Sequence, residues 1–542
     1  MNASRKALGQ TLKESGLITE ELLNYALSIA RTCGERIGET LEKLGFVTDH
    51  EIAQAIARQH GIGFSDLSEP FGPEALRLVP FAFAQKHLVL PLELQEGRLL
   101  LAAEDATNPQ LSALIARFVS HPLVFCIAPK SRLVREIRRR YTRVEHSIDD
   151  EIVRIGQTAM GGRDFPAERL AELVITCGID AQASDIHVSA TPLATLVSLR
   201  VDGVLQLAHS LPAIVHTRLV SAVKVMASLD IADTNRAQDG RIGFNYLEER
   251  HDLRVSTMPG VNGENLVIRV LAGRADLYSL DNIGYSPMQV KQIDRMTRRA
   301  HGAMLVTGPT GSGKTTTLYA MLRRINMLQR NVLTVEDPVE IRLPLARQME
   351  VNEKAGVTFA SAIRAFLRQD PDVILVGEVR DQDTAHLTLR AAQTGHLVLS
   401  TVHTNDAIGV VVRLRDLGCQ DAVLSASLTG VVAQRLVRKL CPHCRQTVPM
   451  AEALREYYRI GPGQVYAHQG CERCRHTGYV GRVAIAEIIE FDDELRGLIE
   501  HGALPTEIER LVRNRGVPSL LDAGMALVAA GITDVDEIER VI

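Results

Sequence analysis

The stretch Gly308-Pro-Thr-Gly-Ser-Gly-Lys314-Thr315 decides the fold of this 542-residue chain. It follows the apolar run Met304-Leu-Val-Thr and leads into an apolar-patterned segment, which predicts a strand, a glycine loop and a helix. Glycines let successive backbone N–H groups turn inward and hold phosphates at the positive end of the helix. Lys314 can reach the β- and γ-phosphates, and Thr315 can place its hydroxyl on Mg²⁺. The predicted nucleoside triphosphate site comprises Gly308, Pro309, Thr310, Gly311, Ser312, Gly313, Lys314, Thr315 and Thr316.

Composition argues against several classes of protein. Apolar residues make up 46% and charged residues 23% of the chain, which is typical of a globular protein with several cores. The net charge of −4 provides no overall basic field of the kind that drives nucleic-acid binding. The chain contains no run of about eighteen apolar residues, the length that a membrane-spanning helix needs. The N-terminus lacks the apolar core of a signal peptide. We therefore expect a cytoplasmic protein with no transmembrane segment.

The chain begins with an internal repeat. Leu8-Gly9 and Gly16 recur 29 positions later as Ile37-Gly38 and Gly45. Each copy predicts a short helix, a glycine turn and a second helix. Further along, an acidic and glycine-rich stretch between two apolar modules is typical of a linker. The expected domains are a tandem helical repeat at 1–60, a small α/β domain at 61–143, a linker at 144–165, an α+β domain at 166–272, the phosphate-loop domain at 283–435, a cysteine module at 436–485 and a helical region at 486–542.

Carboxylates follow two of the predicted strands of the phosphate-loop domain. Val332-Leu-Thr-Val is followed by Glu336 and Glu340, and Val373-Ile-Leu-Val-Gly is followed by Glu378. In a doubly wound sheet, ligands bind at the carboxyl ends of the strands. Carboxylates there can hold Mg²⁺ or polarise the water that attacks a γ-phosphate, and the alternative is solvated strand ends. The residue before Glu378, where many such enzymes have a metal-holding Asp, is Gly377.

Two histidines flank the apolar strand that comes next. His396 precedes Leu-Val-Leu-Ser-Thr-Val, and His403 follows it. Polar side chains beside such a strand suit a sensor of the γ-phosphate. Packing roles for both histidines are the alternative interpretation.

Four of the eight cysteines form two Cys-x-x-Cys pairs. Cys441-Pro-His-Cys444 and Cys471-Glu-Arg-Cys474 can each bring two thiolates to one metal ion. A closed site of four thiolates is typical of structural Zn²⁺. Disulfides are the alternative, and His443 is a competing ligand. The remaining cysteines are scattered and are interpreted as small buried residues.

These motifs together resemble the secretion ATPase superfamily, and more narrowly the ATPases of type II secretion and type IV pilus assembly. The likeness covers about 165–542. It rests on the phosphate loop, the Glu336-Asp337 box, the segment from Leu367 to Glu378, the segment from His396 to His403, and the motifs Asp185-Ile-His187, Arg200-Val-Asp-Gly, Gln238-Asp-Gly-Arg241 and Val432-Ala-Gln-Arg435.

The resemblance implies an α/β, multidomain fold. A RecA-like ATPase core would follow an α+β, PAS-like domain, with helical and α+β domains at the N-terminus and a small Cys₄ zinc module after the core. The family also implies a homohexamer that hydrolyses ATP, with Mg²⁺, between the core and the preceding domain. Glu378 would position the attacking water, Glu336 and Glu340 would support it, and Arg200 would reach the γ-phosphate.

The resemblance further implies partners and a place of action. Hydrolysis would drive assembly of a pilus or pseudopilus, with the chain docked peripherally at the inner membrane on a platform or coupling protein. The cysteine module is typical of assembly and secretion members, whereas retraction ATPases generally lack it. A second arginine of the family falls at Ala222 here, with Arg218 one helical turn earlier. A DNA-transfer translocase and a nucleotide-dependent scaffold with negligible turnover are the alternatives.

The N-terminal repeat resembles the cyclic di-GMP-binding module of mannose-sensitive pilus ATPases. Its second copy keeps Arg36 and Gln59, which we take as candidate contacts to cyclic di-GMP. The first copy has Ala7 and Ala30 at the corresponding positions. A helical docking domain without a ligand is the alternative.

Overall fold

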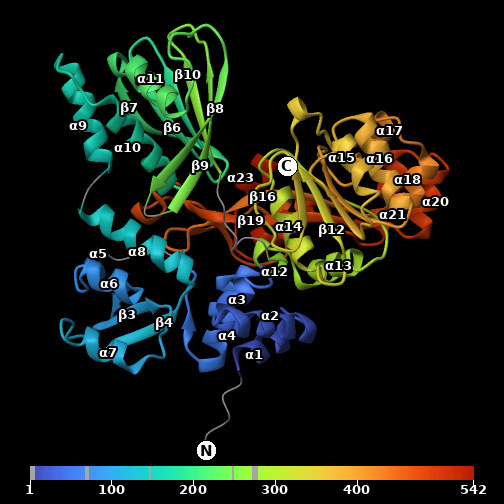
Figure 1. Cartoon of the computed structure of the whole chain (residues 1–542), viewed down its shortest axis with the longest axis horizontal. Helices are drawn as coiled ribbons and strands as arrows, with labels where there is room; N and C mark the ends of the chain where they lie inside the picture. Colours follow the sequence, from blue (N-terminus) through green and yellow to red (C-terminus); the bar gives the residue numbers. More distant parts are fainter. Residues whose placement is uncertain (1–6, 68–72, 146–147, 247–248, 272–278) are drawn as a thin grey trace, which may run out of the picture. The chain divides into compact units, whose positions relative to one another are not determined.

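The computed structural model describes residues 7–67, 73–145, 148–246, 249–271 and 279–542 (Figure 1). The chain forms two compact units. One contains residues 49–273 and the chain up to Leu12, and the other contains residues 13–48 and 274–542. Among the described helices, none combines the length and apolar character that a membrane span requires.

The N-terminal repeat forms four short helices. The glycines that separate the helices of each copy, Gly16 and Gly45, have φ of 74° and 71°, a conformation that glycine adopts without strain. The Thr19 hydroxyl accepts a hydrogen bond from the Leu22 amide at 3.3 Å and caps the second helix. The helices are α1 (Leu8–Glu14), α2 (Glu20–Cys33), α3 (Ile37–Lys43) and α4 (Asp49–His60).

The first unit contains a small α/β domain after α4. Its four strands lie in the order β1-β4-β3-β2, with parallel pairs around β4 and an antiparallel β2–β3 pair. The elements are β1 (Gly63–Phe64), α5 (Pro73–Leu76), α6 (Phe81–His87), β2 (Val89–Gln95), β3 (Arg98–Ala103), α7 (Pro109–Ile115), β4 (Leu123–Ile127) and α8 (Lys130–Glu145).

The segment expected to be a linker instead contains a packed helix. Helix α9 spans Ile148–Met160, and Ile152, Ile155 and Ala159 on one of its faces are buried in the core of the following domain. The acidic residues that suggested a solvated linker occupy the first turn of α9, where negative charge favours a helix N-terminus. The linker interpretation of 144–165 is therefore wrong for residues 148–160.

The rest of the first unit is an α+β domain. Six antiparallel strands lie in the order β7-β6-β5-β10-β9-β8. The helices that accompany this sheet bury apolar faces, including Ala222, in one core with it. The elements are α10 (Ala167–Asp180), β5 (Asp185–Ala190), β6 (Ala194–Val201), β7 (Val204–Pro212), α11 (His216–Met226), β8 (Gln238–Tyr246), β9 (Glu249–Met258) and β10 (Asn265–Leu271).

The second unit is built on a seven-stranded sheet with the order β13-β12-β14-β15-β11-β16-β19. The pairings from β13 through β16 are parallel, and β19 pairs antiparallel to β16. Successive residues of β11 alternate between two cores: Ala303 and Leu305 pack in one, and Met304 and Val306 in the other. Both faces of the sheet are therefore covered, as in doubly wound α/β folds.

The predicted strand, loop and helix order around Lys314 is confirmed: the loop connects β11 to α14. The strands are β11 (Gly302–Thr307), β12 (Val332–Glu336), β13 (Arg347–Glu350), β14 (Val373–Val376), β15 (Leu397–Val402), β16 (Leu428–Leu440), β17 (Gln446–Val448), β18 (Val465–Ala467) and β19 (Tyr479–Glu490). The helices are α12 (Leu280–Ile283), α13 (Pro287–Thr297), α14 (Lys314–Arg323), α15 (Phe359–Phe366), α16 (Gln382–Gln393), α17 (Gly409–Asp416), α18 (Asp421–Ser427), α19 (Glu452–Tyr457), α20 (Asp493–Glu500), α21 (Pro505–Asn514), α22 (Leu520–Ala529) and α23 (Val535–Val541).

Candidate functional site

The glycines of the phosphate loop are required by close contact with strand β16. Gly308 and Gly313 have φ of 150° and 86°. A Cβ atom at Gly308 would lie 2.5 Å from the backbone oxygen of Gln434, and one at Gly313 would lie 2.8 Å from the Gln434 amide nitrogen. Side chains at these positions would push the loop away from the sheet. The loop conformation therefore depends on glycine at both places.

The side chain of Gln434, on β16, attaches the phosphate loop to the sheet. Its Nε2 donates a hydrogen bond to the backbone oxygen of Ser312 at 2.6 Å. Its Oε1 accepts hydrogen bonds from the hydroxyls of Thr317, at 2.7 Å, and Tyr285. The Gln434 side chain is fully buried, so these hydrogen bonds are shielded from water. In the sequence, Gln434 stands out only as part of the motif Val432-Ala-Gln-Arg435, and no local pattern indicates that it holds the loop.

Lys314, at the start of α14, folds back over the loop. Its ammonium donates hydrogen bonds to the backbone oxygens of Gly308, at 2.8 Å, and Pro309, at 3.0 Å. Burial lowers the pKa of the Lys314 ammonium to about 8. An anion placed at the loop would favour the charged form and would compete for the same donors. The side chain is thus positioned to exchange carbonyl partners for phosphate oxygens.

The hydroxyl groups around the loop are placed to bind a phosphate group and a metal ion. Within the described residues, no hydrogen bond involves the hydroxyl of Thr315 or Thr316, and the buried Ser312 hydroxyl has no partner. Buried polar groups in proteins are almost always hydrogen-bonded, so the orphaned Ser312 hydroxyl points to a missing partner. The residues present therefore fit a bound nucleotide with Mg²⁺ near Thr315.

Glu378 lies just beyond β14, at the same edge of the sheet as the loop. The backbone of Gly377 is tied to both neighbouring strands: its amide donates to Val335 at 2.8 Å, and its carbonyl accepts from the Thr401 hydroxyl at 2.8 Å. The Glu378 carboxylate lies 2.5 Å from Arg380 Nη2 and 3.5 Å from His403 Nε2. Burial and the nearby Lys314 charge lower the pKa of the His403 imidazole, which favours its neutral form at pH 7.

Glu336 and Glu340 have different surroundings. The buried Glu336 carboxylate accepts hydrogen bonds from the hydroxyls of Tyr319 and Thr334, both at 2.5 Å, and from Gln348 Nε2 at 3.2 Å. These partners fix the position of the carboxylate at the end of β12. Glu340 is exposed, beyond the strand. The geometry thus supports a positioning role for Glu336.

The two flanking histidines lie at opposite ends of β15. β15 runs parallel to β11, so His403 follows the carboxyl end where the loop begins. His396 precedes the amino end, where its carbonyl accepts a hydrogen bond from the Gly302 amide at 3.0 Å. Its ring nitrogen Nδ1 lies 2.9 Å from the Ala391 carbonyl. The structure therefore brings His403 to this site and does not bring His396 there.

The candidate arginines belong to the first unit. Arg200 lies on β6, is partly exposed, and donates a hydrogen bond to the Gly203 carbonyl at 3.1 Å. Arg218 on α11 donates to the Asp164 carboxylate at 2.5 Å and stacks over the Phe165 ring at 4.2 Å. Ala222, on the same helix, is buried in the core. Arg218 is thus engaged locally, and the role of Arg200 at the nucleotide stays a prediction.

The four module cysteines converge. Their sulfur atoms lie 4.0 Å apart for Cys441–Cys471, 3.8 Å for Cys444–Cys474 and 3.7 Å for Cys471–Cys474. Ligands of tetrahedral Zn²⁺ with Zn–S bonds of about 2.3 Å lie about 3.8 Å apart, whereas a disulfide needs about 2.05 Å. The donor set therefore fits one Zn²⁺ ion. His443 lies outside the cluster, with its Nδ1 2.9 Å from Arg473 Nη1.

The backbone also stabilises one of these thiolates, that of Cys474, whereas burial raises the pKa of the Cys441 and Cys444 thiols. Burial opposes ionisation, but N–H groups of Cys471, at 3.1 Å, and Gly478, at 3.2 Å, donate to the Cys474 sulfur and lower the pKa of its thiol to about 7. Deprotonated sulfur is the form that binds metal.

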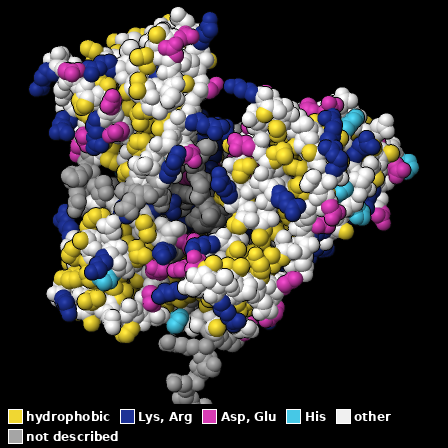
Figure 2. All heavy atoms as spheres, viewed as in Figure 1, with side chains coloured by type: hydrophobic (Ala, Val, Ile, Leu, Met, Phe, Trp, Pro, Cys, Tyr) yellow, Lys and Arg dark blue, Asp and Glu magenta, His cyan; other side chains and the backbone are white. Residues whose placement is uncertain are grey.

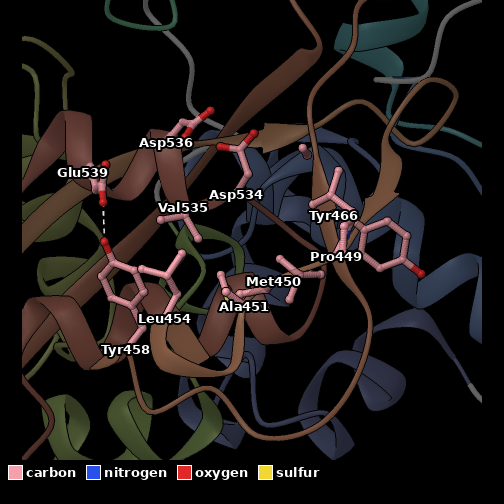
Figure 3. Close-up of a pocket in the computed structure, with 13 residues that line it drawn as sticks. Pro449, Met450, Ala451, Leu454, Tyr458, Tyr466, Asp534, Val535, Asp536 and Glu539 are labelled. Carbon is pink, nitrogen blue, oxygen red and sulfur yellow. Dashed lines mark hydrogen bonds between the residues drawn. The ribbon is translucent and has the colours of Figure 1, made fainter. Parts of the chain in front are cut away.

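A separate pocket of about 300 Å³ lies beside this module (Figure 3). Apolar side chains of Met450, Leu454 and Val535 line it, and the Tyr458 hydroxyl points to the Glu539 carboxylate and donates a hydrogen bond to it. No residue of the phosphate loop lines this pocket. It is therefore distinct from the nucleotide site.

The candidate cyclic di-GMP residues lie on the N-terminal repeat. Arg36 is exposed at the N-cap of α3, and Gln59 is half-buried near the end of α4. The two residues belong to different compact units. Their joint role in binding stays a prediction.

Comparisons with known proteins connect this geometry to a family. Residues 162–540 match the sequence family described as Type II/IV secretion system protein, and residues 60–147 match the MshEN domain. The Type IV pilus assembly ATPase PilB of Thermus thermophilus is 37% identical over 94% of this chain, which spans 59% of that protein's length. The Type II secretion system protein E of Dickeya dadantii is 39% identical over 86% of this chain and 98% of its own length.

A solved structure shares the fold. The ATPase DotB of Yersinia pseudotuberculosis covers 70% of this chain and 95% of its own length, with a TM-score of 0.52 and 21% identity. At this identity the likeness supports the RecA-like fold and nothing finer.

Gln434→Ala should weaken nucleotide binding. The substitution leaves the Ser312 carbonyl and the Thr317 and Tyr285 hydroxyls without their buried partner, at about 1–3 kcal/mol for an unsatisfied group. We expect the Kd for a fluorescent ATP analogue to rise about tenfold, equivalent to about 1.4 kcal/mol. Gln420→Ala, at an exposed position, is the matched control. An unchanged Kd in Gln434→Ala would show that the loop does not depend on this contact.

Cys441→Ser should remove the zinc of the cysteine module. One thiolate of a closed four-ligand site is lost, so the variant should hold about one Zn²⁺ fewer per chain than the wild type, measured by elemental analysis. Cys33→Ser removes an exposed thiol outside the cluster and should leave the zinc content unchanged. Equal zinc in Cys441→Ser and the wild type would refute the assignment.

Proposed function

Because this chain belongs to the Type II/IV secretion system protein family, we propose that it is an ATPase that drives assembly of a type IV pilus or of a type II secretion pseudopilus. The observation that carries this proposal is the shared edge of the second unit's sheet, where the phosphate loop and Glu378 meet. Relatives named for both systems match most of this chain, so the proposal is made at the level common to both.

The residues at this edge have separate roles in ATP hydrolysis. Backbone N–H groups of the loop and the Lys314 ammonium bind the phosphates, and Thr315 supplies a hydroxyl ligand for Mg²⁺. Mg²⁺ neutralises charge on the phosphate oxygens when it is bound. Glu378 accepts a hydrogen bond from the attacking water and orients it, while Arg380 and His403 hold its carboxylate. The buried carboxylate of Glu336 supports the same edge.

We also propose how the site is completed. In the secretion ATPases that this chain resembles, the nucleotide lies between the ATPase domain and the preceding domain of a homohexamer. Arg200 is the residue of the first unit that matches a family arginine, and its partly exposed guanidinium is available for a γ-phosphate. The burial of Ala222 and the local contacts of Arg218 favour Arg200 as the arginine contributed by this domain.

The proposed partners follow from the same family. The chain would act on the cytoplasmic face of the inner membrane, docked on a platform or coupling protein of the secretion or pilus machine. A DNA translocase is disfavoured by the net charge of −4. Figure 2 shows Lys and Arg together with Asp and Glu on the visible surface, rather than a face of a single sign.

Substitution of Glu378 tests the enzyme directly. Glu378→Gln keeps the shape of the side chain but removes the charge that orients water, so we expect ATP turnover to fall about 10²-fold or more. Lys314→Ala should abolish nucleotide binding and turnover together. Glu452→Gln changes an exposed glutamate elsewhere in the unit and should behave as the wild type. Phosphate release at saturating ATP and Mg²⁺ is the measurement, and equal rates for Glu378→Gln and the wild type would support the scaffold alternative.

We propose cyclic di-GMP as a ligand of the N-terminal repeat. The support is the sequence resemblance at Arg36 and Gln59 and the repeated helix–glycine–helix geometry. Calorimetric titration of the full chain should show binding that Arg36→Ala weakens at least tenfold, because a guanidinium–phosphate contact is lost. Arg31→Ala, also exposed, is the control. A flat titration of the wild type would leave docking as the role of the repeat.

A further inference from the structure

Three residues that the proposed function does not use meet in the first unit. Asp149 lies in the first turn of α9, Cys177 lies on α10, and His209 lies on β7. Asp149 Oδ1 is 3.0 Å from His209 Nε2, Cys177 Sγ is 3.8 Å from His209 Nε2, and Cys177 Sγ is 3.9 Å from Asp149 Oδ1. A carboxylate, a thiol and an imidazole from three elements thus bring their ligand atoms within 4.8 Å of one another.

The spacing of these atoms fits a tetrahedral metal ion. Ligands at about 2.0–2.3 Å from Zn²⁺ lie about 3.3–3.8 Å apart. The cysteine module of the same chain provides a comparison: its sulfur atoms lie 3.7–4.0 Å apart. At the Asp149 cluster the two distances to Cys177 Sγ, 3.8 and 3.9 Å, match these values. The Oδ1–Nε2 distance of 3.0 Å is that of a hydrogen-bonded pair, which a bound ion would widen by a few tenths of an ångström.

The orientation of the imidazole argues against a nucleophilic triad. In such a triad, the thiol contacts one ring nitrogen and the carboxylate orients the other. Here Asp149 and Cys177 both face Nε2 of His209. A proton cannot be relayed through the ring in this arrangement, whereas a single ion can bind all three atoms.

We propose that Asp149 Oδ1, Cys177 Sγ and His209 Nε2 form a second metal site that binds a divalent transition-metal ion, with Zn²⁺ as the best match. Thiolate and imidazole ligands select zinc over Mg²⁺ or Ca²⁺. The carboxylate and thiolate together carry a charge of −2, which balances the ion. On loading, the thiol proton of Cys177 is released to solvent. Water takes the fourth position.

The site has both a buried and an open side. The His209 side chain is 8% exposed, which fixes the ring, and Asp149 is 73% exposed, which lets metal enter from solvent. Because α9 bears Asp149 while α10 and β7 bear the other ligands, a bound ion ties α9 to this domain. The site thereby reinforces the packing of Ile152 and Ile155 in the core.

The zinc content of the purified chain tests this proposal. The untagged full chain is incubated with excess ZnCl₂, desalted, and analysed for zinc per chain. We expect about two Zn²⁺ for the wild type and about one for Cys177→Ser and for Asp149→Asn, because each loses one of three ligands. Asp149 is exposed, so Asp149→Asn keeps the test valid even where substitution of Cys177 disturbs folding. Cys33→Ser, which removes an exposed thiol, should keep two.

A cobalt substitution distinguishes this site from the cysteine module. In the Cys441→Ser background, Co²⁺ should still give a thiolate-to-cobalt absorption band, and adding Cys177→Ser should abolish it. One Zn²⁺ per wild-type chain, or zinc and cobalt signals that persist when Cys177 is replaced, would overturn the proposal.

Discussion

The buried hydrogen bonds of Gln434 are the interaction on which the nucleotide site depends. They attach the phosphate loop to β16, the strand beside β11, and so fix the loop relative to the sheet. The contact is so close that Gly308 and Gly313 have no room for a Cβ atom. Through the Thr317 and Tyr285 hydroxyls, the same amide also holds α14 and the segment before α13. A rigid loop presents its N–H groups without reorganisation when phosphate arrives.

Parallel strands then place the other chemical groups opposite the loop. β14 and β15 end at the same edge as β11, so Glu378 and His403 follow their carboxyl ends. The Thr401 hydroxyl joins the ends of β14 and β15 at Gly377. This backbone contact fixes Gly377, the residue before Glu378, which has no side chain that could bind a metal. In the proposed mechanism Glu378, held by Arg380 and His403, orients the water, and Thr315 supplies the hydroxyl for Mg²⁺.

Local pattern predicted the parts of this site that lie close together in sequence. The glycine loop, the carboxylates after apolar strands and the two Cys-x-x-Cys pairs each depend on neighbours within a few residues. Local pattern could not predict contacts between residues far apart in the sequence. Gln434 contacts Tyr285, 149 residues away, and His209 contacts Cys177, 32 residues away. His396 precedes β15, so the rule that ligands bind at the carboxyl ends of parallel strands would have separated it from His403. Composition also gave a wrong prediction at α9, because the acidic residues of its first turn were interpreted as part of a solvated linker.

We propose that nucleotide binding and hydrolysis are separable in this protein, with Lys314 binding the phosphates and Glu378 orienting the attacking water. A single-turnover experiment tests it most directly. The Glu378→Gln chain is mixed with less than one equivalent of radiolabelled ATP and Mg²⁺, passed over a desalting column, and the protein-bound nucleotide is identified. We expect the Glu378→Gln chain to retain unhydrolysed ATP, while the wild type yields ADP. ADP recovered from Glu378→Gln at the wild-type rate would contradict it.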